Sequence, residues 1–431
     1  MNGGYVFQDG NPAFSDTKLD GYSYAPYYPT QNSDFNDYST FRIFVDSRSL
    51  HYVPQQAYIE IKGQLVKKTG GTAFAAAAKI SFTHNPVQLL FRQLSYKLNG
   101  EYVERVDYPG FASNLLHNVL ETSTHDNSTG LEYFFVPDDG DGTAADTNKG
   151  WEIRRKWLID TPDTEGTFAM RIPLSKIFGF AEYPYTISKY SHEIEFNRQE
   201  DYYSLFKATA AGAGKLKISS VVLWMPHADP SLAMTLSLKQ AELNNSSDYV
   251  IHYRKRMVVQ ADVPAAVTSW DFTASTIAFP NRPQWLFVGF QTGTKTDQDS
   301  NFSLFKHLDV QDMFVVVNTR QYPQHLNSAD FAECNLGRFY RDMVNVRANL
   351  LGVSPVLNET GLTPSAFRDL RTIFAFDLTK GDDEIKGSAA TTILRCKFAK
   401  AVPTGGAKAY ILMLSDAEAH LKRDGSSLVL R

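Results

Sequence analysis

The sequence predicts an all-β protein of two tandem jelly-roll β-sandwiches, a double jelly roll, with short inserted helices. Three observations predict this fold. Most of the chain alternates short runs of β-branched and aromatic residues with turn residues. The order of these runs in the first half recurs in the second half. The chain has 431 residues, enough for two hydrophobic cores, since a single core stops growing at roughly 250–300 residues.

Residues 1–37 differ in composition from the rest of the chain. They are polar and rich in Tyr, Asn and Asp, they include Pro12, Pro26 and Pro29, and they show no sustained periodicity. Such a segment cannot bury enough apolar surface to form a core. We interpret residues 1–37 as an extended N-terminal arm that becomes ordered where a neighbouring molecule supplies the missing surface. The alternative is a passive tail.

Residues 38–235 are predicted to form the first jelly roll. Asn99-Gly100 predicts a two-residue hairpin turn, because both residues readily adopt positive φ angles. Residues 110–121 predict a helix whose apolar face is made of Phe111, Leu115, Val119 and Leu120. The predicted strands lie in the runs "STFRIFVDS", "AYIEIKGQLV", "KISFT", "QLSYKLN", "TFAMRIPL", "HEIEFN" and "KLKISSVVLWM".

Residues 236–431 are predicted to form the second jelly roll, joined to the first near Pro230–Leu243. A helix is predicted over 328–350, with an apolar stripe of Phe331, Leu336, Phe339, Tyr340, Met343 and Leu350. The predicted strands lie in the runs "YVIHYRKRMVVQ", "WDFTASTIAF", "QWLFVGFQ", "DMFVVVN", "TIFAFDLTK", "TTILRCKFA" and "KAYILMLS".

One passage of the chain occurs in two versions. Residues 96–120 read "YKLNGEYVERVDYPGFASNLLHNVL", and residues 314–344 read "FVVVNTRQYPQHLNSADFAECNLGRFYRDMV". Each runs from an apolar strand through a tight polar turn and a Tyr-Pro pair to an amphipathic helix. The matched segments lie about 200 residues apart, whereas the units of solenoid proteins are roughly 20–50 residues long. The sequence therefore predicts that one whole domain is duplicated, with the two helices in equivalent places.

Composition limits the classes of partner. The net charge of −4 offers no general attraction to nucleic acid or anionic lipid. Cys334 and Cys396 are the only cysteines, too few for a disulfide framework, and we expect them to be unpaired in a reducing compartment. The chain begins without the basic start and apolar run of a signal peptide, and it has no stretch of about 18 apolar residues. We expect a soluble protein without a membrane span.

Five motifs carry a resemblance to a known family: "RIPLSKIFGF", "LWMPHADPS", "QWLFVGFQTG", "LGRFYRD" and "TPSAFRDL". With these motifs in this order, residues 38–425 resemble the major capsid proteins of the Polinton/Maverick and adintovirus group and related copies integrated in invertebrate genomes. The resemblance implies homotrimers of pseudo-hexagonal outline that tile an icosahedral shell around double-stranded DNA. It also implies contacts with neighbouring capsomers, penton proteins and minor capsid proteins, and a place in the virion capsid after assembly in the host nucleus or cytoplasm.

The sequence predicts no enzymatic activity and no catalytic, cofactor-binding or metal-binding residue. The loop "DDGDGTAAD" contains Asp138, Asp139, Asp141 and Asp146 and superficially suggests a calcium site. The spacing is wrong for a calcium loop, because placing Gly142 at the turn leaves Asn148 where a bidentate Glu is required. We interpret the segment as a solvated loop.

Other motifs of enzymes are missing from the sequence. There is no HExxH, CxxC, P-loop, G-x-S-x-G or G-x-G-x-x-G pattern. We interpret Gly179 in "IFGFAEYP" as a turn or close-packing glycine, and His227 as a residue at a strand end that hydrogen-bonds locally.

Two basic clusters are candidates for weak, non-specific contact with packaged DNA. They are "IRRKW" at 153–157 and "YRKRM" at 253–257, and each combines cations with aromatic residues. Because side chains of a strand alternate between its two faces, the second cluster can instead present two cations to solvent or to an acidic neighbouring subunit. We favour this second interpretation.

Three alternatives to a shell protein remain open at this stage. A carbohydrate- or receptor-binding sandwich would use exposed aromatic residues, for which Trp151, Trp157, Tyr183, Tyr185 and Tyr190 are candidates. A cupin-type enzyme would need several histidines and a carboxylate that converge, but the histidines here are scattered. A host-domesticated copy of a capsid protein would have the same sequence pattern as a viral one.

Overall fold

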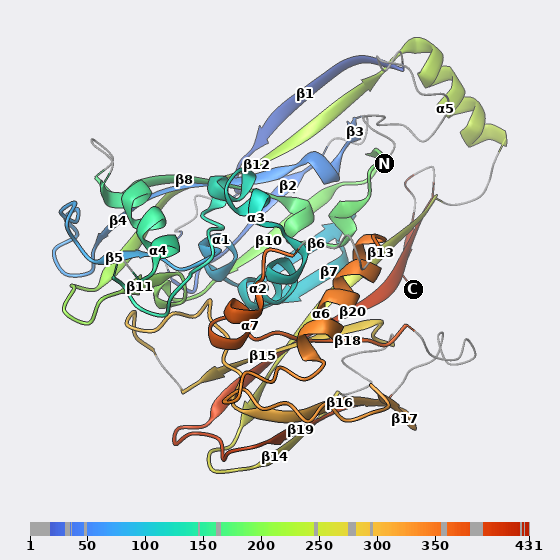
Figure 1. Ribbon diagram of the computed structural model, residues 1–431. Coiled ribbons are helices and arrows are strands. Elements are labelled where there is room, and N and C mark those ends of the chain that lie inside the picture. The colour runs from blue at the N-terminus through green and yellow to red at the C-terminus, as the bar shows by residue number, and fades with distance from the viewer. Residues whose placement is uncertain are drawn as a thin grey trace.

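The computed structural model is shown in Figure 1. The residues that it describes are 18–30, 35, 37–46, 50–144, 147–160, 165–244, 249–274, 282–293, 296–354, 360–379, 391–422, 425 and 427–430.

The first half folds into a sandwich of two main sheets. In sheet A, β12 pairs with β4 and β3 along one edge and with β1 along the other. Strand β8 pairs with the other edge of β4, and β9 pairs with β3. These strands are β1 (Leu19–Tyr27), β3 (His51–Tyr52), β4 (Tyr58–Lys67), β8 (Thr167–Pro173), β9 (Ile187–Ser188) and β12 (Gly214–Pro230). Sheet B has the order β2 (Thr40–Val45), β10 (His192–Arg198), β6 (Phe91–Leu98) and β7 (Glu101–Asp107). The short sheet C pairs β5 (Ile80–Phe82) with β11 (Leu205–Lys207).

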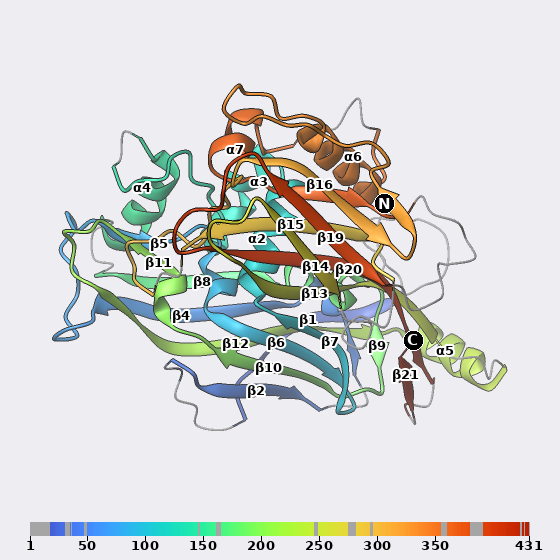
Figure 2. The ribbon, with the colours of Figure 1, turned by 90° about the horizontal axis from the view of Figure 1, so that it is seen from below.

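The second half folds into a sandwich of the same plan. Sheet D has the order β13 (Tyr249–Val263), β20 (Ala407–Leu421), β15 (Trp285–Thr292) and β18 (Phe374–Asp377), and β21 (Leu428–Leu430) pairs with the end of β20. Sheet E has the order β14 (Ser269–Ala274), β19 (Thr392–Phe398), β16 (Val310–Val317) and β17 (Arg320–Tyr322). Figure 1 shows sheet E at the bottom of the molecule, with β15 and β18 of sheet D directly above it. In Figure 2, which is seen from that side, sheets E and D overlap and sheet B lies below both in the picture.

The two sandwiches share one strand topology. In each, the first strand pairs with the last, as β1 with β12 and β13 with β20, and the last strand pairs with β4 or β15 on its other edge. The order β2–β10–β6–β7 likewise corresponds to β14–β19–β16–β17. Eight strands in two packed sheets with these connections are a jelly roll. The predicted double jelly roll is therefore confirmed, and one continuous hydrophobic core runs through both halves.

Short helices connect the strands. The α-helices are α1 (Pro86–Leu89), α2 (Pro109–Leu120), α3 (Ser123–Asp126), α4 (Lys149–Arg155), α5 (Leu232–Asn244), α6 (Phe339–Leu351) and α7 (Pro364–Asp369). Single turns of other helix types are η1 (Pro54–Gln56), η2 (Thr129–Tyr133), η3 (Lys156–Asp160), η4 (Leu174–Lys176), η5 (Phe180–Glu182) and η6 (Asp201–Tyr203).

The predicted helix over 110–121 is confirmed as α2, and Asn99-Gly100 forms the β6–β7 turn with φ angles of 48° and 86°. The helix predicted over 328–350 is wrong in its first part, because the structure starts α6 at Phe339. Ser328, Cys334 and Gly337 have φ angles of 48°, 58° and 56°. A right-handed helix cannot contain such left-handed residues, so 328–338 forms turns instead.

The predicted arm also needs correction. Leu19–Tyr27 is strand β1, which pairs with β12 inside the chain and so needs no neighbouring molecule to become ordered. Its side chains are exposed or half-buried, which explains why its sequence has no core-forming pattern. Residues 1–17 lie outside the described residues. The expected joint between the halves is helix α5, which spans the predicted boundary at 235/236.

Candidate functional site at the junction of the two sandwiches

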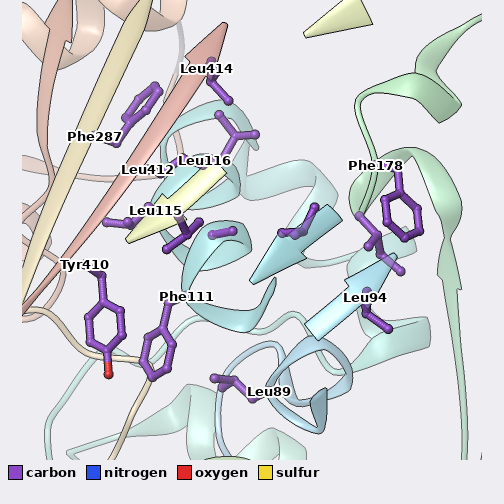
Figure 3. Close-up of a cluster of buried hydrophobic side chains, with 14 of the residues drawn as sticks. Leu89, Leu94, Phe111, Leu115, Leu116, Phe178, Phe287, Tyr410, Leu412 and Leu414 are labelled. Atoms are coloured by element: carbon purple, nitrogen blue, oxygen red, sulfur yellow. The ribbon is translucent and has the colours of Figure 1, made fainter. Parts of the chain in front are cut away.

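The junction between the sandwiches is centred on α2, which fits onto the outer face of sheet D. The ring of Phe111 stacks on that of Tyr410 with a centroid distance of 3.8 Å and an interplanar angle of 12°. Leu115 lies over Gly289, where a Cβ atom would come within 2.8 Å of the Leu115 side chain. Figure 3 shows α2 side chains pointing toward Phe287, Leu412 and Tyr410 of sheet D. The two sandwiches therefore pack against each other through a close-packed apolar interface.

A buried carboxylate crosses the same junction. Glu104 of β7 accepts hydrogen bonds from the backbone N–H groups of Arg256 in β13 at 2.9 Å and Phe180 at 3.0 Å. Burial raises the pKa of Glu104 above its ordinary value, and the Arg256 guanidinium opposes this rise. Glu104 therefore satisfies backbone groups of both halves that would otherwise be buried without partners.

Arg256 continues this polar connection. Its guanidinium donates to the carbonyls of Lys176 at 2.8 Å and Ser175 at 3.0 Å, and to the Glu182 carboxylate at 2.6 Å. Beside it, a Cβ atom on Gly179 would meet the backbone oxygen of Arg254 at 1.9 Å. The "RIPLSKIFGF" and "YRKRM" segments are thus directly packed together, and Gly179 is a close-packing glycine as predicted.

The acidic loop contributes an ion pair to the interior. Asp138 is buried, accepts from the Arg154 guanidinium at 2.6 Å, and accepts from the Asn301 side chain of the second half at 2.9 Å. Asp139 accepts from the backbone N–H of Gly150 at 3.2 Å. Asp146 lies outside the described residues. Asp138 is therefore structural, and the solvated-loop prediction is wrong for this residue.

The chain was compared with protein-family models and solved structures. Residues 80–418 match the model of the double jelly roll-like domain. The chain belongs to this family. The comparison with curated proteins gave no match.

Solved structures of viral capsids share this double jelly-roll fold. The Sputnik virophage structure matches with a TM-score of 0.65 and 10% identity, over 99% of this chain and 91% of that chain. The mavirus major capsid protein matches with a TM-score of 0.57 and 10% identity, over 99% and 92% of the two chains. The PBCV-1 virus capsid matches with a TM-score of 0.53 and 10% identity, over 97% and 98%. At this identity the likeness shows the fold.

Several arginines of the two basic clusters make their contacts within the protein. In the first cluster, Arg154 and Arg155 are buried, and Arg155 is paired with Glu152 at 2.7 Å. In the second, Arg256 joins the junction, and Arg254 lies 5.0 Å over the ring of Trp285. The prediction that the second cluster presents its cations to solvent is wrong for Arg256. Lys156 of the first cluster has a side chain that is 64% exposed.

The aromatic candidates for a sugar site are only partly available. Trp151 is buried, and the Tyr190 hydroxyl donates to the backbone of the C-terminal segment. Trp157 is 48% exposed, and Tyr183 and Tyr185 pack edge to face with ring centroids 5.5 Å apart. The structure places Trp151 on α4 and Trp157 on η3. Tyr183 and Tyr185 lie in the segment after η5, and Tyr190 lies after β9. The aromatic candidates therefore lie on different segments of the first jelly roll.

The structure places both cysteines and His227. Cys334 is exposed, Cys396 is buried, and neither forms a disulfide. His227 lies near the end of β12, and its partner is the Tyr27 hydroxyl at 2.9 Å, on the strand that the sequence did not predict. In the described part of the chain, no three His, Cys, Asp or Glu residues cluster as metal ligands, and no helix is long and apolar enough to cross a membrane.

Little in the sequence points to the residues of the junction. Glu104, Arg256 and Tyr253 are ordinary residues of alternating strands, and the Tyr253 hydroxyl donates to the Val103 carbonyl at 2.9 Å. The usable signal was the unbroken apolar runs of β15 and β20, since strands buried on both faces lose the polar alternation.

Proposed function

We propose that this chain is a major capsid protein of the Polinton/Maverick and adintovirus type, a structural protein without enzymatic activity. It forms homotrimers of pseudo-hexagonal outline that tile an icosahedral shell around double-stranded DNA. One observation carries the proposal: two jelly rolls of the same topology are fixed side by side in one chain by a buried interface.

The physical reason is geometric. Three chains with two similar blocks each present six blocks, which suit a hexagonal lattice, and closed three-fold symmetry satisfies the contacts between subunits. The fold shared with the virophage, mavirus and PBCV-1 capsid structures supports this role. Within a virion, the trimers would contact neighbouring capsomers, pentons and minor capsid proteins, and packaged DNA only weakly.

The proposal is tested on purified full-length protein by light scattering coupled to size-exclusion chromatography and by negative-stain electron microscopy. We expect three chain masses and particles with a hexagonal outline. A monomer at micromolar concentration, without assembly at higher concentration, would contradict the capsid role.

A further inference from the structure

Three histidines gather around one buried phenylalanine beside α2. The ring centroid of Phe135 lies 4.2 Å from that of His84, 5.3 Å from that of His125 and 6.4 Å from that of His117. His84 precedes α1, His117 lies on α2 and His125 lies on α3. We call these three residues the histidine cluster. Histidine is the side chain whose charge ordinarily changes between pH 5 and pH 8.

Two rings of the histidine cluster are buried without a group that would stabilise their charged form. His84 and His117 are 1% and 3% exposed. Among the described residues, no atom hydrogen-bonds to either ring nitrogen of His84, and Nδ1 of His117 lies 2.9 Å from the neutral hydroxyl of Ser113. A proton on either ring would create a buried charge without a counterion, so both rings stay neutral in the packed chain.

The charged groups around these two rings oppose protonation further. They are Arg371, Arg154 and His125 for His84, and Lys176, Arg256, His125 and His84 for His117. Burial lowers the pKa of both rings well below the usual range, and these cations add to the lowering. The carboxylates next to these cations are already paired: Asp138 with Arg154, Glu182 with Arg256 and Glu121 with Lys176, while Glu104 accepts from backbone N–H groups.

His125 differs from the other two because it has counterions of its own. Its Nδ1 atom lies 3.4 Å from the Asp126 carboxylate and 3.7 Å from the Glu121 carboxylate, and its Nε2 atom lies 2.9 Å from the Tyr133 hydroxyl. A proton on His125 is therefore compatible with the packed chain. The unfavourable protonation is that of the two fully buried rings.

The second jelly roll contacts the chain directly at these two rings. The Ser303 hydroxyl donates to the backbone carbonyl of His84 at 2.9 Å. The Arg371 guanidinium donates at 3.0 Å to the side chain of Asn118, the residue after His117. Helix α6 lies next to α2 at this junction (Figure 1). The segments around Ser303 and Arg371 thus help to keep water away from the histidine cluster.

We propose that the histidine cluster is an acid-sensitive switch of the junction: when His84 and His117 take up protons, the segments around Ser303 and Arg371 separate from α2 while both sandwiches stay folded. The stacked rings of Phe111 and Tyr410 lie at the other end of α2 and carry no group that takes up a proton between pH 7.5 and pH 5.0. They hold the two sandwiches together in the open form. The switch belongs to the single chain, so it goes beyond the proposed function and does not depend on the homotrimer.

The size of the effect follows from the two protonation states. In the open form each ring is solvated and takes up a proton below pH ~6.5, whereas in the closed form both rings stay neutral. Between pH 7.5 and pH 5.0, each of the two histidines should therefore raise the ratio of open to closed chains by about 30-fold, and both together by about 1,000-fold.

The switch is tested by hydrogen–deuterium exchange of the full-length protein at pH 7.5 and pH 5.0, with each rate divided by the intrinsic exchange rate at that pH. Peptides that cover α2, residues 301–305 and residues 364–372 should exchange at least tenfold faster at pH 5.0. Peptides from β4 and β12 in sheet A should change by less than twofold. Equal acceleration in all peptides would show global unfolding and overturn the switch, as would no acceleration at α2.

Two substitutions in the cluster sharpen the measurement. His84→Phe keeps a ring packed on Phe135, and His117→Asn keeps a polar partner for the Ser113 hydroxyl. Each variant should reduce the acceleration at α2 by about 30-fold. Because they are independent, His117→Asn still tests the switch if His84→Phe does not fold, which circular dichroism at pH 7.5 checks.

The matched control is His192→Phe. His192 is as fully buried as His84, but it lies on β10 of sheet B and contacts Tyr52 and Tyr96 outside the cluster. This variant should keep the wild-type acceleration at α2. Cluster variants that exchange like the wild type, or a His192→Phe protein that loses the acceleration, would overturn the assignment. Exchange is read within one chain, so these outcomes are distinct from a failure to form trimers.

Discussion

Four strands of sheet A and four of sheet D lie in the same order, β8–β4–β12–β1 and β18–β15–β20–β13, but the outer faces of the two sheets differ. In sheet D, every residue of β15 from Trp285 to Gln291 is buried, because sheet E covers one face and α2 covers the other. In sheet A, β4 buries its inner residues, while Tyr58, Lys62 and Gln64 on the outer face reach solvent. A jelly roll alone requires only one buried face per sheet. The second face of sheet D is buried because helix α2 packs on it.

The first strands of the two sandwiches show the same contrast. Strand β13 pairs with β20 over its whole length, Tyr249–Val263, and carries Arg256 into the junction. Strand β1 is shorter, pairs only with the outer end of β12, and has no fully buried side chain. One topological position thus holds a core strand in one half and a surface strand in the other.

The largest expected effect comes from filling the closest contact of the junction. Gly179→Ala would place a Cβ atom 1.9 Å from the Arg254 carbonyl oxygen, so that the backbone of β13 must move. We expect a loss of more than about 4 kcal/mol in the free energy of unfolding, measured by urea titration. Gly142→Ala is the control, since nothing lies within 4 Å of its added Cβ. Equal stability of the two variants would contradict the close packing.

A pair of truncations compares the two outer faces directly. Phe287→Ala removes a fully buried ring of sheet D and should cost about 3–5 kcal/mol. Tyr58→Ala removes the half-exposed ring at the corresponding position of sheet A and should cost only about 1 kcal/mol in the unassembled chain. Both are measured by urea titration at low protein concentration. Similar losses would show that sheet A is covered within the chain.

Acid should destabilise the protein through buried histidines. Burial lowers the pKa of His192 to about 3. Burial also lowers the pKa values of His84 and His117 well below the usual range, and neighbouring cations, such as Arg371 beside His84, add to this lowering. These groups stay neutral in the folded chain, so the unfolded chain binds more protons below pH ~6.5. Their stabilisation is complete above pH ~6.5 and is lost as the pH falls toward 3, by about 2 kcal/mol per histidine at pH 5.

Unfolding titrations at pH 7.5 and pH 5.0 measure this loss. His84→Phe should reduce the loss by about 2 kcal/mol, because His84 packs on Phe135 and neither ring nitrogen has a hydrogen-bond partner among the described residues. His325→Phe, at an exposed position, should leave the loss unchanged. A His84→Phe protein with the wild-type pH dependence would show that His84 does not contribute.

The smallest effect is expected at the cysteines. Cys334 is exposed and Cys396 is buried, and neither forms a disulfide. Cys334→Ser should change stability by less than about 0.5 kcal/mol. Cys396→Ala should cost about 1 kcal/mol through the lost sulfur contacts. The double variant should keep the oligomeric state seen by light scattering, and a monomer that appears only under reducing conditions would contradict this.

Local patterns in the sequence were sufficient for much of the fold. The strand runs, the Asn99-Gly100 turn and helix α2 depend on residues near one another in the chain, so propensity and periodicity identify them. The repeat of their order was enough to predict a duplicated jelly roll, because each copy must bury the same faces. The apolar stripe over 328–350 led to a helix start that is too early, because periodicity does not reveal the left-handed residues before Phe339, where α6 begins.

Tertiary structure alone decided the roles of the polar residues and of the first strand. Arg154 and Arg256 look like surface cations in sequence, but Asp138, 16 residues before Arg154, and Glu182, 74 residues before Arg256, provide the partners that permit their burial. Leu19–Tyr27 has no apolar alternation to reveal a strand, and it is ordered through backbone hydrogen bonds to β12, about 200 residues later. Backbone pairing and buried ion pairs join distant segments, and neither leaves a periodic signal in either segment.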